Sequence, residues 1–287
     1  MQRRFIENCP AGCVAPFEAT DILLPEGALM RCTACGQLVS QMTEADYHRS
    51  MQAFDSTAFN LPNARESKRR YAYARRRLAR ALRLLGDAPA LPRLLDVGCS
   101  RGDFVAAAAQ LGFAAEGIEP APHIAEAARA AGRTVHTGLL EEQKFPTARF
   151  DILSLFEVIE HLRAPLPLLE ECRRILRPGG ILIISTGNTT SWTARAMKAR
   201  WDYFQIGKDA GHVSFFNPRS MALLAVRAGF EMAALSTGRV RFAERGDLPG
   251  WAHGAAKLAA EALSLPARLL GRGHDMLVYL QRPRERV

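Results

Sequence analysis

The chain has 287 residues, of which 48% are hydrophobic, and a formal net charge of +9. That length suffices for one large core and a small appended module. No apolar run approaches the roughly 20 residues that a membrane-spanning helix needs. The N-terminal sequence MQRRFIENCP is charged but lacks the apolar stretch of a secretory signal. These features argue against an integral membrane protein or a secreted one, and we expect a cytoplasmic protein.

The positive charge is concentrated in one segment. Residues 65–83 carry nine basic side chains and one acidic side chain, so the rest of the chain is almost neutral. The excess therefore describes one basic helix and not a protein-wide nucleic-acid-binding surface. This helix is either simply solvated, or it attracts an anionic substrate such as a nucleotide-sugar or lipid-linked phosphate. A third interpretation is peripheral contact with an anionic membrane surface.

Four of the six cysteines fall within the first 45 residues. Cys9 and Cys13 form one close pair, and Cys32 and Cys35 form the other. Four thiolates at such spacing are typical of a structural zinc site, and the metal would supply much of the folding free energy of so short a segment. Disulfides are the alternative, but they require an oxidising compartment. We predict a zinc-binding module over residues 1–45, which is structural or else binds a partner or nucleic acid.

Residues 46–90 are predicted to be a basic helical connector, because Tyr71, Ala74, Leu78 and Leu82 recur at helical spacing. From residue 91 to the end at 287, strands and helices alternate, which indicates an α/β fold with a doubly wound, mostly parallel sheet. The predicted strands are Arg93–Val97, Ala114–Glu119, Thr134–Thr137, Asp151–Phe156, Ile181–Ser185, Glu231–Ser236 and Met276–Gln281. The predicted helices are Asp103–Leu111, His123–Ala131, Leu166–Leu176 and one that runs from the cap Asn217 to Gly229.

A glycine-containing turn follows the first of these strands. It reads Gly98-Cys99-Ser100-Arg101-Gly102, which departs from the G-x-G-x-x-G pattern of dinucleotide-binding proteins. Small residues in such a turn let a ligand approach the backbone, unless they merely make the turn tight. An incoming pyrophosphate would meet Asp103, whereas the zwitterionic end of a methionine derivative fits better. Glu119 ends the second strand, where acids accept ribose hydroxyls.

These residues resemble a known family. The segments LLDVGCSRGDF, GIEP, FDILSLFEVIEHL and LRPGGILIIST are similar to class I S-adenosylmethionine-dependent methyltransferases over about residues 91–235, with a shorter match at GHDMLVYLQRP. The resemblance implies a Rossmann-like sheet of seven strands with the last one antiparallel. It also implies that S-adenosylmethionine is the cofactor.

The resemblance assigns the donor site residue by residue. Asp96, Gly98, Cys99, Ser100 and Gly102 would line the methionine end of the donor, Glu119 its ribose, and Leu139 and Leu140 its adenine. Phe156 is a further predicted cofactor-binding residue. Many family members have an aspartate near position 139 for the adenine amino group. This chain has leucine there, so a backbone group or Glu141 would take over that contact. The remaining cysteine, Cys172, is expected to be a buried small hydrophobic residue, as is the side chain of Cys99.

The fourth strand is followed by Glu157, Glu160 and His161, and His212 comes later in the chain. If the first three begin a helix, they share one face. This set resembles the divalent-metal site of ubiquinone-pathway and small-RNA O-methyltransferases, in which the ion would bind the acceptor hydroxyl. Alternatively, His161 or His212 is a metal-free general base, or the set is structural.

The segment 187–217 contains Trp192, Trp201, Tyr203 and Phe204 and is predicted to be the acceptor-binding lid within the 91–287 domain. Trp192 or Trp201 either stacks on an acceptor ring or packs in the core. The expected function is methyl transfer to a hydroxyl of a small-molecule sugar, lipid-linked or quinone-like acceptor. The alternatives are an RNA methyltransferase and a non-catalytic cofactor-binding partner in a biosynthetic complex.

Overall fold

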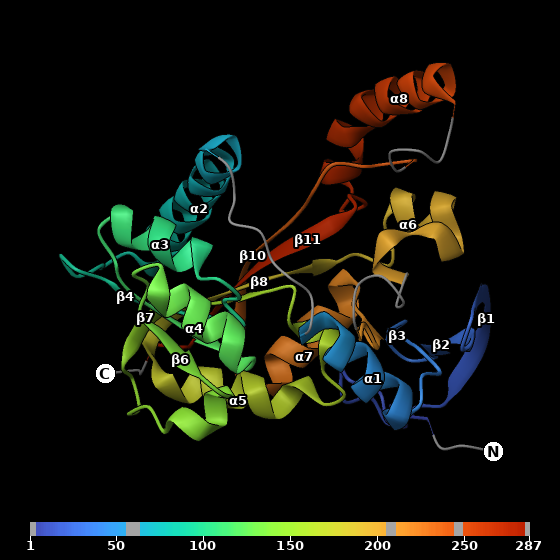
Figure 1. Ribbon diagram of the computed structural model, residues 1–287. Coiled ribbons are helices and arrows are strands. Elements are labelled where there is room, and N and C mark those ends of the chain that lie inside the picture. The colour runs from blue at the N-terminus through green and yellow to red at the C-terminus, as the bar shows by residue number, and fades with distance from the viewer. Residues whose placement is uncertain (1–3, 56–63, 205–210, 244–248, 285–287) are drawn as a thin grey trace.

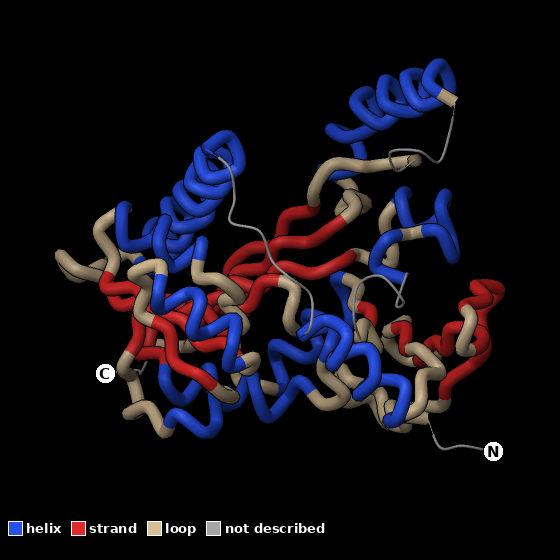
Figure 2. Tube along the Cα trace, in the orientation of Figure 1, coloured by secondary structure: helices blue, strands red, loops and turns tan. Residues whose placement is uncertain are grey.

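The computed structural model describes residues 4–55, 64–204, 211–243 and 249–284. Two sheets organise these residues (Figures 1 and 2). A seven-stranded sheet is built from the later part of the chain, and a four-stranded sheet combines the N-terminal segment with one short strand from the lid.

The large sheet confirms the predicted α/β class. Its strand order is β10-β11-β8-β7-β4-β5-β6, and β11 pairs antiparallel with both of its neighbours while the other ladders are parallel. Strands β4, β7 and β8 lie in the middle and are buried on both faces, which accounts for their continuous apolar sequences. The strands are β4 (Arg93–Val97), β5 (Ala114–Glu119), β6 (Val135–Thr137), β7 (Phe150–Phe156), β8 (Leu176–Gly187), β10 (Glu231–Thr237) and β11 (Asp275–Gln281).

Helices cover both faces of this sheet. On one face, α2 (Ala64–Leu85) and α3 (Asp103–Gln110) share a buried apolar cluster with β4, β7, β8 and β11. On the other face, α5 (Pro165–Ile175) and α7 (Pro218–Arg227) bury their apolar sides in the largest cluster of the molecule's described part. Helix α4 (Pro122–Ala130) packs beside β6 at the edge. The apolar stripe predicted for the basic segment is real, because Ala74, Leu78 and Leu85 are buried.

Strand β8 is longer than the predicted Ile181–Ser185. It begins at Leu176, directly after α5, so the Pro178-Gly179-Gly180 sequence belongs to the strand and not to a separate turn. A side chain at Gly180 would lie 2.8 Å from the Arg177 carbonyl oxygen. Only glycine fits this close approach, and the chain can therefore turn from helix to strand without a loop.

The small sheet was not predicted. It consists of β1 (Phe17–Leu24), β2 (Gly27–Cys32), β3 (Leu38–Val39) and β9 (Ser214–Phe215) in that order, with antiparallel ladders throughout. Strand β9 belongs to the predicted lid, and it pairs with β3 from the N-terminal module. The side chain of Gln37 also donates a hydrogen bond of 3.1 Å to the hydroxyl of Ser214. The lid and the module are thus one structural unit.

A separate core supports the small sheet. It joins Leu29 and Val39 of the module to Met197, Trp201 and Phe204 of the lid, and all five are almost fully buried. Helix α1 (Glu44–Asp55) and the short helix α6 (Trp192–Met197) flank this core, and Tyr47 of α1 packs against it. The division of the chain at residues 45 and 90 stays a prediction, although the large and small sheets have distinct apolar clusters.

Helix α8 (Gly250–Leu269) projects from the body of the molecule after β10 (Figure 1). Several of its leucines are exposed: Leu258, Leu263, Leu265 and Leu269. Within the described ranges, no helix combines the length and the apolar character that crossing a membrane requires.

Candidate functional site

The site forms where four neighbouring strands end. The order β8, β7, β4, β5 places their carboxyl ends side by side, and these strands are parallel to one another. In this register Asp96 of β4 pairs with Ser154 of β7, and Phe156 pairs with Ser185 of β8. The loops after these strands therefore meet at one edge, which is where ligands bind in open α/β sheets.

The turn after β4 is shaped by left-handed backbone conformations. Gly98, Ser100 and Gly102 have φ values of 73°, 50° and 71°. A Cβ atom at position 98 would lie 2.6 Å from a methyl group of Val158, in the turn after β7. Glycine is therefore required there both by conformation and by space. This contact brings the glycine turn against the segment that holds Glu157, Glu160 and His161.

Cys99 contributes its backbone to this turn, and its side chain points into the core. Its side chain is 6% exposed, and a Cβ atom at Gly117 of β5 would lie 2.5 Å from its Sγ atom. The amides of Gly98 and Cys99 both donate hydrogen bonds of 2.9 Å to the carbonyl oxygen of Ile118. The turn is thereby fixed to the neighbouring strand.

Two buried carboxyl groups flank the turn. Burial raises the pKa of Asp96 to about 7, although the hydroxyl of Ser154 opposes this by donating a hydrogen bond of 2.6 Å. Glu119 is 8% exposed, and its two oxygens accept hydrogen bonds from the amides of Ser100 at 2.9 Å and Ala121 at 3.0 Å. Glu119 thus links the glycine turn to the end of β5.

The residues predicted on the adenine side differ in exposure. Leu139 is 53% exposed, whereas Leu140 is 2% exposed and belongs to the core that includes Ile118. Phe156 is partly buried, and its ring meets that of Phe104 edge to face with 4.7 Å between centroids. Phe156 ends β7, directly before the turn that holds Glu157.

Arg77 was missed by the sequence analysis because it lies within a run of exposed basic residues. Unlike them it is 6% exposed, and its Nε and Nη1 atoms have no hydrogen-bond partner among the described residues. Its guanidinium lies over the rings of Tyr73 and Phe156, at 3.0 and 4.9 Å from their centroids. Burial lowers the pKa of Arg77 to about 10. A buried cation with unused donors beside this site is suited to an anionic group of a ligand.

Glu157 occupies a strained position at the end of β7. Its φ of 55° is in the left-handed region, which non-glycine residues rarely adopt. Its carboxylate accepts hydrogen bonds from the hydroxyl of Ser185, at 2.9 Å, and from that of Tyr203. Burial, and next the negative charge of Glu157, raise the pKa of Tyr203 well above its usual value. Glu157 thereby connects β8 to the lid.

Glu160, His161 and His212 lie together, but not as one helical face. A single 3₁₀ turn covers Ile159–His161, and Glu157 is outside it. Glu160 is fully buried, and burial, followed by the negative charge of Glu157, raises the pKa of its carboxyl group well above the usual value. The rings of His161 and His212 meet edge to face, with 4.7 Å between centroids.

His212 has a defined tautomer. Its Nδ1 atom lies 3.1 Å from the carbonyl oxygen of Tyr203. Because a carbonyl oxygen only accepts hydrogen bonds, Nδ1 carries the proton, and neutral His212 has its basic lone pair on Nε2. The segment 187–217 and the turn that holds Glu160 are joined next to this ring, where the amide of Val213 donates to the carbonyl oxygen of Glu160 at 2.9 Å.

The four N-terminal cysteines come together as predicted. Within the described ranges, Cys9, Cys13, Cys32 and Cys35 are the one set of three or more metal-ligating side chains whose ligand atoms gather, all within 4.8 Å of one another. Thiolates about 2.3 Å from a zinc ion lie about 3.8 Å apart in a tetrahedron, so this spacing fits the metal. No comparable group forms at Glu157, Glu160, His161 and His212 in the part of the chain that is described.

The lid's aromatic residues pack in the core. Trp201 is completely buried, and its indole Nε1 donates a hydrogen bond of 3.2 Å to Nδ1 of His274. Trp192 is partly buried against the cluster of Val240 and Ala267. Of the two roles considered for Trp201, core packing is therefore the one observed. Part of the predicted lid, residues 205–210, lies outside the described residues.

The fold and the glycine turn define a class I methyltransferase-type domain, and comparison with known proteins agrees. The family model described as "Methyltransferase domain" matches residues 65–235, which is more than half of the chain. The protein belongs to this family.

Curated relatives match a shorter region. A ubiquinone biosynthesis O-methyltransferase from Cereibacter sphaeroides is 32% identical over 150 residues, covering 48% of this chain and 60% of that protein. One from Xanthomonas axonopodis pv. citri is 27% identical over 160 residues, covering 52% and 66%. The chain thus spans about 60% of the length of the first of these relatives, and the similarity accounts for about half of this chain.

Solved structures support the fold. A SAM-dependent methyltransferase from Archaeoglobus fulgidus aligns with a TM-score of 0.53 at 16% identity, covering 82% of this chain and 100% of that one. A SAM-dependent methyltransferase from Thermotoga maritima, described as a possible histamine N-methyltransferase, aligns with a TM-score of 0.50 at 21% identity, covering 81% and 99%. At such identities the likeness establishes the fold alone.

Proposed function

We propose that this protein transfers a methyl group from S-adenosylmethionine to a hydroxyl of a small-molecule acceptor. The observation that carries the proposal is the contact between Gly98 and Val158, which sets the glycine turn against the turn holding Glu157, Glu160 and His161. A donor bound at the first turn would present its methyl group to an acceptor held at the second. The curated relatives are ubiquinone biosynthesis O-methyltransferases, so a quinone-like hydroxyl is one candidate acceptor beside a sugar or lipid-linked one.

The donor would be held from both sides of the glycine turn. Asp96 and the backbone of residues 98–102 would face the ammonium and carboxylate of the methionine end, and Glu119 would accept the ribose hydroxyls. Arg77 offers unused donors that suit the carboxylate. Phe156 and Leu139 would contact the apolar parts of the donor, since both have exposed surface near these turns.

The proton of the acceptor hydroxyl would be taken by a histidine. Methyl transfer is an in-line displacement at the methyl carbon, so the protein must orient the hydroxyl and remove its proton. His161 is partly exposed, lies next to His212 and follows the turn that touches Gly98. We assign it as the base, with His212 and Glu157 as positioning residues for the lid and the acceptor.

A zinc ion at the four cysteines would be structural, because four thiolates leave no coordination position for a substrate. A second divalent ion at Glu157, Glu160, His161 and His212 stays a separate proposal. Their ligand atoms do not gather in the described structure, so we route no step through such an ion. Elemental analysis before and after mild chelation distinguishes one tightly held zinc from an additional exchangeable ion.

A peripheral contact of α2 with an anionic surface is also a proposal. It is supported by the exposed Arg69, Arg75, Arg76 and Arg83 on α2 and by the exposed leucines of α8. Sedimentation with vesicles that contain or lack phosphatidylglycerol measures it. Binding that requires the anionic lipid supports this contact, and equal recovery in the supernatant with both vesicles refutes it.

The activity is tested with S-adenosylmethionine labelled in its methyl group. Catechol-like quinone precursors, sugar nucleotides and a structured RNA are offered in parallel to the wild-type protein and to His161→Ala. We expect label in a small-molecule acceptor and about 10² to 10⁴ times less with His161→Ala, as for loss of a general base. Label only in RNA would contradict the small-molecule assignment. Donor binding without label in any acceptor would favour a non-catalytic partner.

A further inference from the structure

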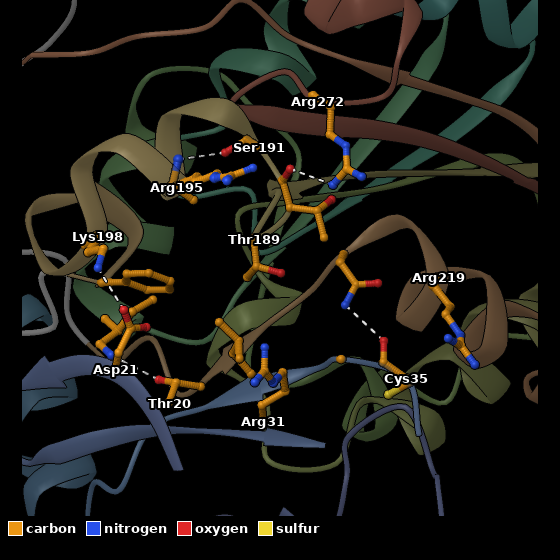
Figure 3. A pocket seen from close by; sticks show the side chains of 17 residues that line it. Thr20, Asp21, Arg31, Cys35, Thr189, Ser191, Arg195, Lys198, Arg219 and Arg272 are labelled. Carbon is orange, nitrogen blue, oxygen red and sulfur yellow. Dashed lines mark hydrogen bonds and ion pairs between the residues drawn. The ribbon is translucent and has the colours of Figure 1, made fainter. Parts of the chain in front are cut away.

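A cavity of about 640 Å³ lies between the small sheet and the segment that follows β8 (Figure 3). Its wall includes Arg31 of β2, Thr189 and Arg195 after β8, Arg219 of α7 and Arg272 before β11. These residues come from segments far apart in the sequence, and Figure 3 shows Thr189 in the middle of the view with the arginines around it. Its volume is that of a small-molecule site and not of a single bound ion.

The cavity is strongly basic. Among the described residues that line it, Asp21 is the one acidic residue, and five are basic: Arg31, Arg195, Lys198, Arg219 and Arg272. Two of the five are already paired, since Lys198 contacts Asp21 at 2.7 Å and Arg31 contacts Glu18 at 2.9 Å. The remaining three guanidinium groups carry positive charge without an acidic partner in the described part of the chain.

Two of these three groups have no acceptor within the described structure. Within the described structure, the guanidinium groups of Arg195 and Arg219 form neither hydrogen bonds nor ion pairs, and Arg272 donates to the carbonyl oxygen of Thr190 at 3.0 Å. The Oγ1 atom of Thr189 is buried and has no partner in that structure either. The three guanidinium groups are exposed to solvent. Because arginine has no acceptor atom, a ligand that replaces solvent along this wall must supply several acceptor oxygens.

We propose that the cavity binds the phosphate or diphosphate portion of the acceptor. Arginine forks match phosphate oxygens with two parallel hydrogen bonds. A carboxylate presents its two oxygens on one side, whereas a diphosphate ester presents oxygens in several directions. Arg195, Arg219 and Arg272 come from three separate segments of the chain around one cavity, which suits a diphosphate ester. The acceptor class is accordingly a phosphorylated small molecule, such as a nucleotide-linked or lipid-linked diphosphate.

The cavity adjoins the catalytic edge. Phe204 lines it, and the neighbouring residue Tyr203 bonds to Glu157. Thr189 follows β8 by two residues, and Ser185 of β8 bonds to Glu157 from the other side. In this proposal, a ligand whose phosphates are bound in the cavity extends past Tyr203 towards the donor. This inference rests on the proposed methyl transfer and adds the chemistry of its acceptor.

Calorimetric titration of the whole protein with inorganic pyrophosphate and with uridine diphosphate tests the inference. The test variant is Arg195→Ala with Arg219→Ala, both exposed residues whose replacement leaves the core intact. The matched control is Arg75→Ala with Arg76→Ala, which removes the same charge from exposed positions on α2. We expect the test variant to bind both ligands about tenfold or more weakly, from the loss of two charge-assisted contacts, and the control to bind as the wild type does.

The outcomes separate this inference from the proposed function. Equal binding by the test variant, or equal weakening by the control, overturns the cavity as a phosphate site. Binding to phosphatidylglycerol vesicles without binding of either soluble diphosphate also overturns it. Titration with S-adenosylhomocysteine is run on the same samples. We expect the test variant to bind S-adenosylhomocysteine as the wild type does while it loses diphosphate binding. If the wild type itself does not bind S-adenosylhomocysteine, the methyl-transfer proposal is refuted instead.

Discussion

Two parts of this protein, the proposed donor-binding part (the donor half) and the proposed acceptor-binding part (the acceptor half), are built in opposite ways. The donor half, from β4 to β6, is made by residues close in sequence: the turn at 98–102, the acid at 119 and the helix between them. The acceptor half is made by long-range contacts, such as the β3–β9 pairing and the hydrogen bond of 3.2 Å from Asn217 Nδ2 to the carbonyl oxygen of Cys35. The two halves have separate apolar clusters. The donor half is therefore specified largely by local sequence, whereas the acceptor half is held together by contacts between the N-terminal module and the segment 187–217.

Loss of the zinc site is the largest perturbation expected. Structural zinc contributes roughly 10 kcal/mol or more to the folding of small modules. Replacing Cys32 and Cys35 by serine should remove hydrogen-exchange protection from β2, β3 and β9 while β4 and β5 keep theirs. The variant should still bind S-adenosylhomocysteine but lose methyl transfer.

A matched control for that experiment is Cys172→Ala, which removes a buried cysteine outside the metal cluster. It should keep one zinc per chain by elemental analysis. If the double serine variant loses protection equally in both halves, the two halves are not independent, and the comparison fails.

Trp201 tests the core of the acceptor half. The side chain is fully buried between the lid and the module. Trp201→Ala should lower the free energy of unfolding of this half by about 3–5 kcal/mol, as large aromatic truncations in cores do. Denaturant unfolding followed by hydrogen exchange measures it. Trp192→Ala, at a partly buried position, should cost clearly less, and an equal cost would contradict the packing described.

Asp96 should make the stability of the donor half depend on pH. Its pKa is raised to about 7 in the folded protein by burial, so between pH 4 and 7 the folded state binds more protons than the unfolded state. The free energy of unfolding then falls as the pH rises through this interval, by up to about 4 kcal/mol, and is level above it. Denaturant unfolding of the wild type and Asp96→Asn at several pH values measures the contribution of Asp96 to this pH dependence. Parallel curves for the two proteins would contradict it.

Two glycines in the donor half distinguish the destabilisation that comes from steric overlap from the destabilisation that comes from backbone conformation. Gly98→Ala meets Val158 at 2.6 Å with a φ of 73°, whereas Gly112→Ala has open space at a φ of 88°. Both should lose about 1 kcal/mol from the backbone alone. Only Gly98→Ala should lose more stability and weaken donor binding about tenfold or more in calorimetry. Equal effects at both sites would show that the turn does not press on Val158.

Replacing Arg77 should have the smallest effect on stability, and the direction of that change is informative. Because its buried guanidinium has unused donors, Arg77→Met should leave the stability of the ligand-free protein unchanged or raise it slightly. The same change should weaken binding of S-adenosylhomocysteine about tenfold, from the loss of a charge-assisted contact. Arg76→Met, at an exposed position, should change neither. A clear loss of stability without a change in binding would make Arg77 structural.

The sequence predicted the fold of residues 93–137 well because its determinants are local. Strand, glycine turn, helix and Glu119 follow one another within about 27 residues, and each residue type has a physical reason at its place. The seven strands and the flanking helices followed from the same alternation, with errors at the ends of β8.

The acceptor half was predicted only in part. The cysteine spacing correctly indicated a cluster, but no pattern in residues 1–45 indicated that β3 would pair with a strand from the lid. The buried state of Arg77 was hidden because its neighbours Arg75 and Arg76 are exposed, and only the packing of α2 distinguishes them. Glu157 was expected within a helical turn, whereas its left-handed backbone depends on its contacts with Ser185 and Tyr203.

The most direct test of the account is calorimetric titration of the wild-type protein and Glu119→Ala with S-adenosylhomocysteine and with NAD. We predict a one-to-one complex of the wild type with S-adenosylhomocysteine, no heat with NAD, and much weaker binding by Glu119→Ala. Binding of NAD in place of S-adenosylhomocysteine, or equal binding of the latter by both proteins, would contradict the donor site described above.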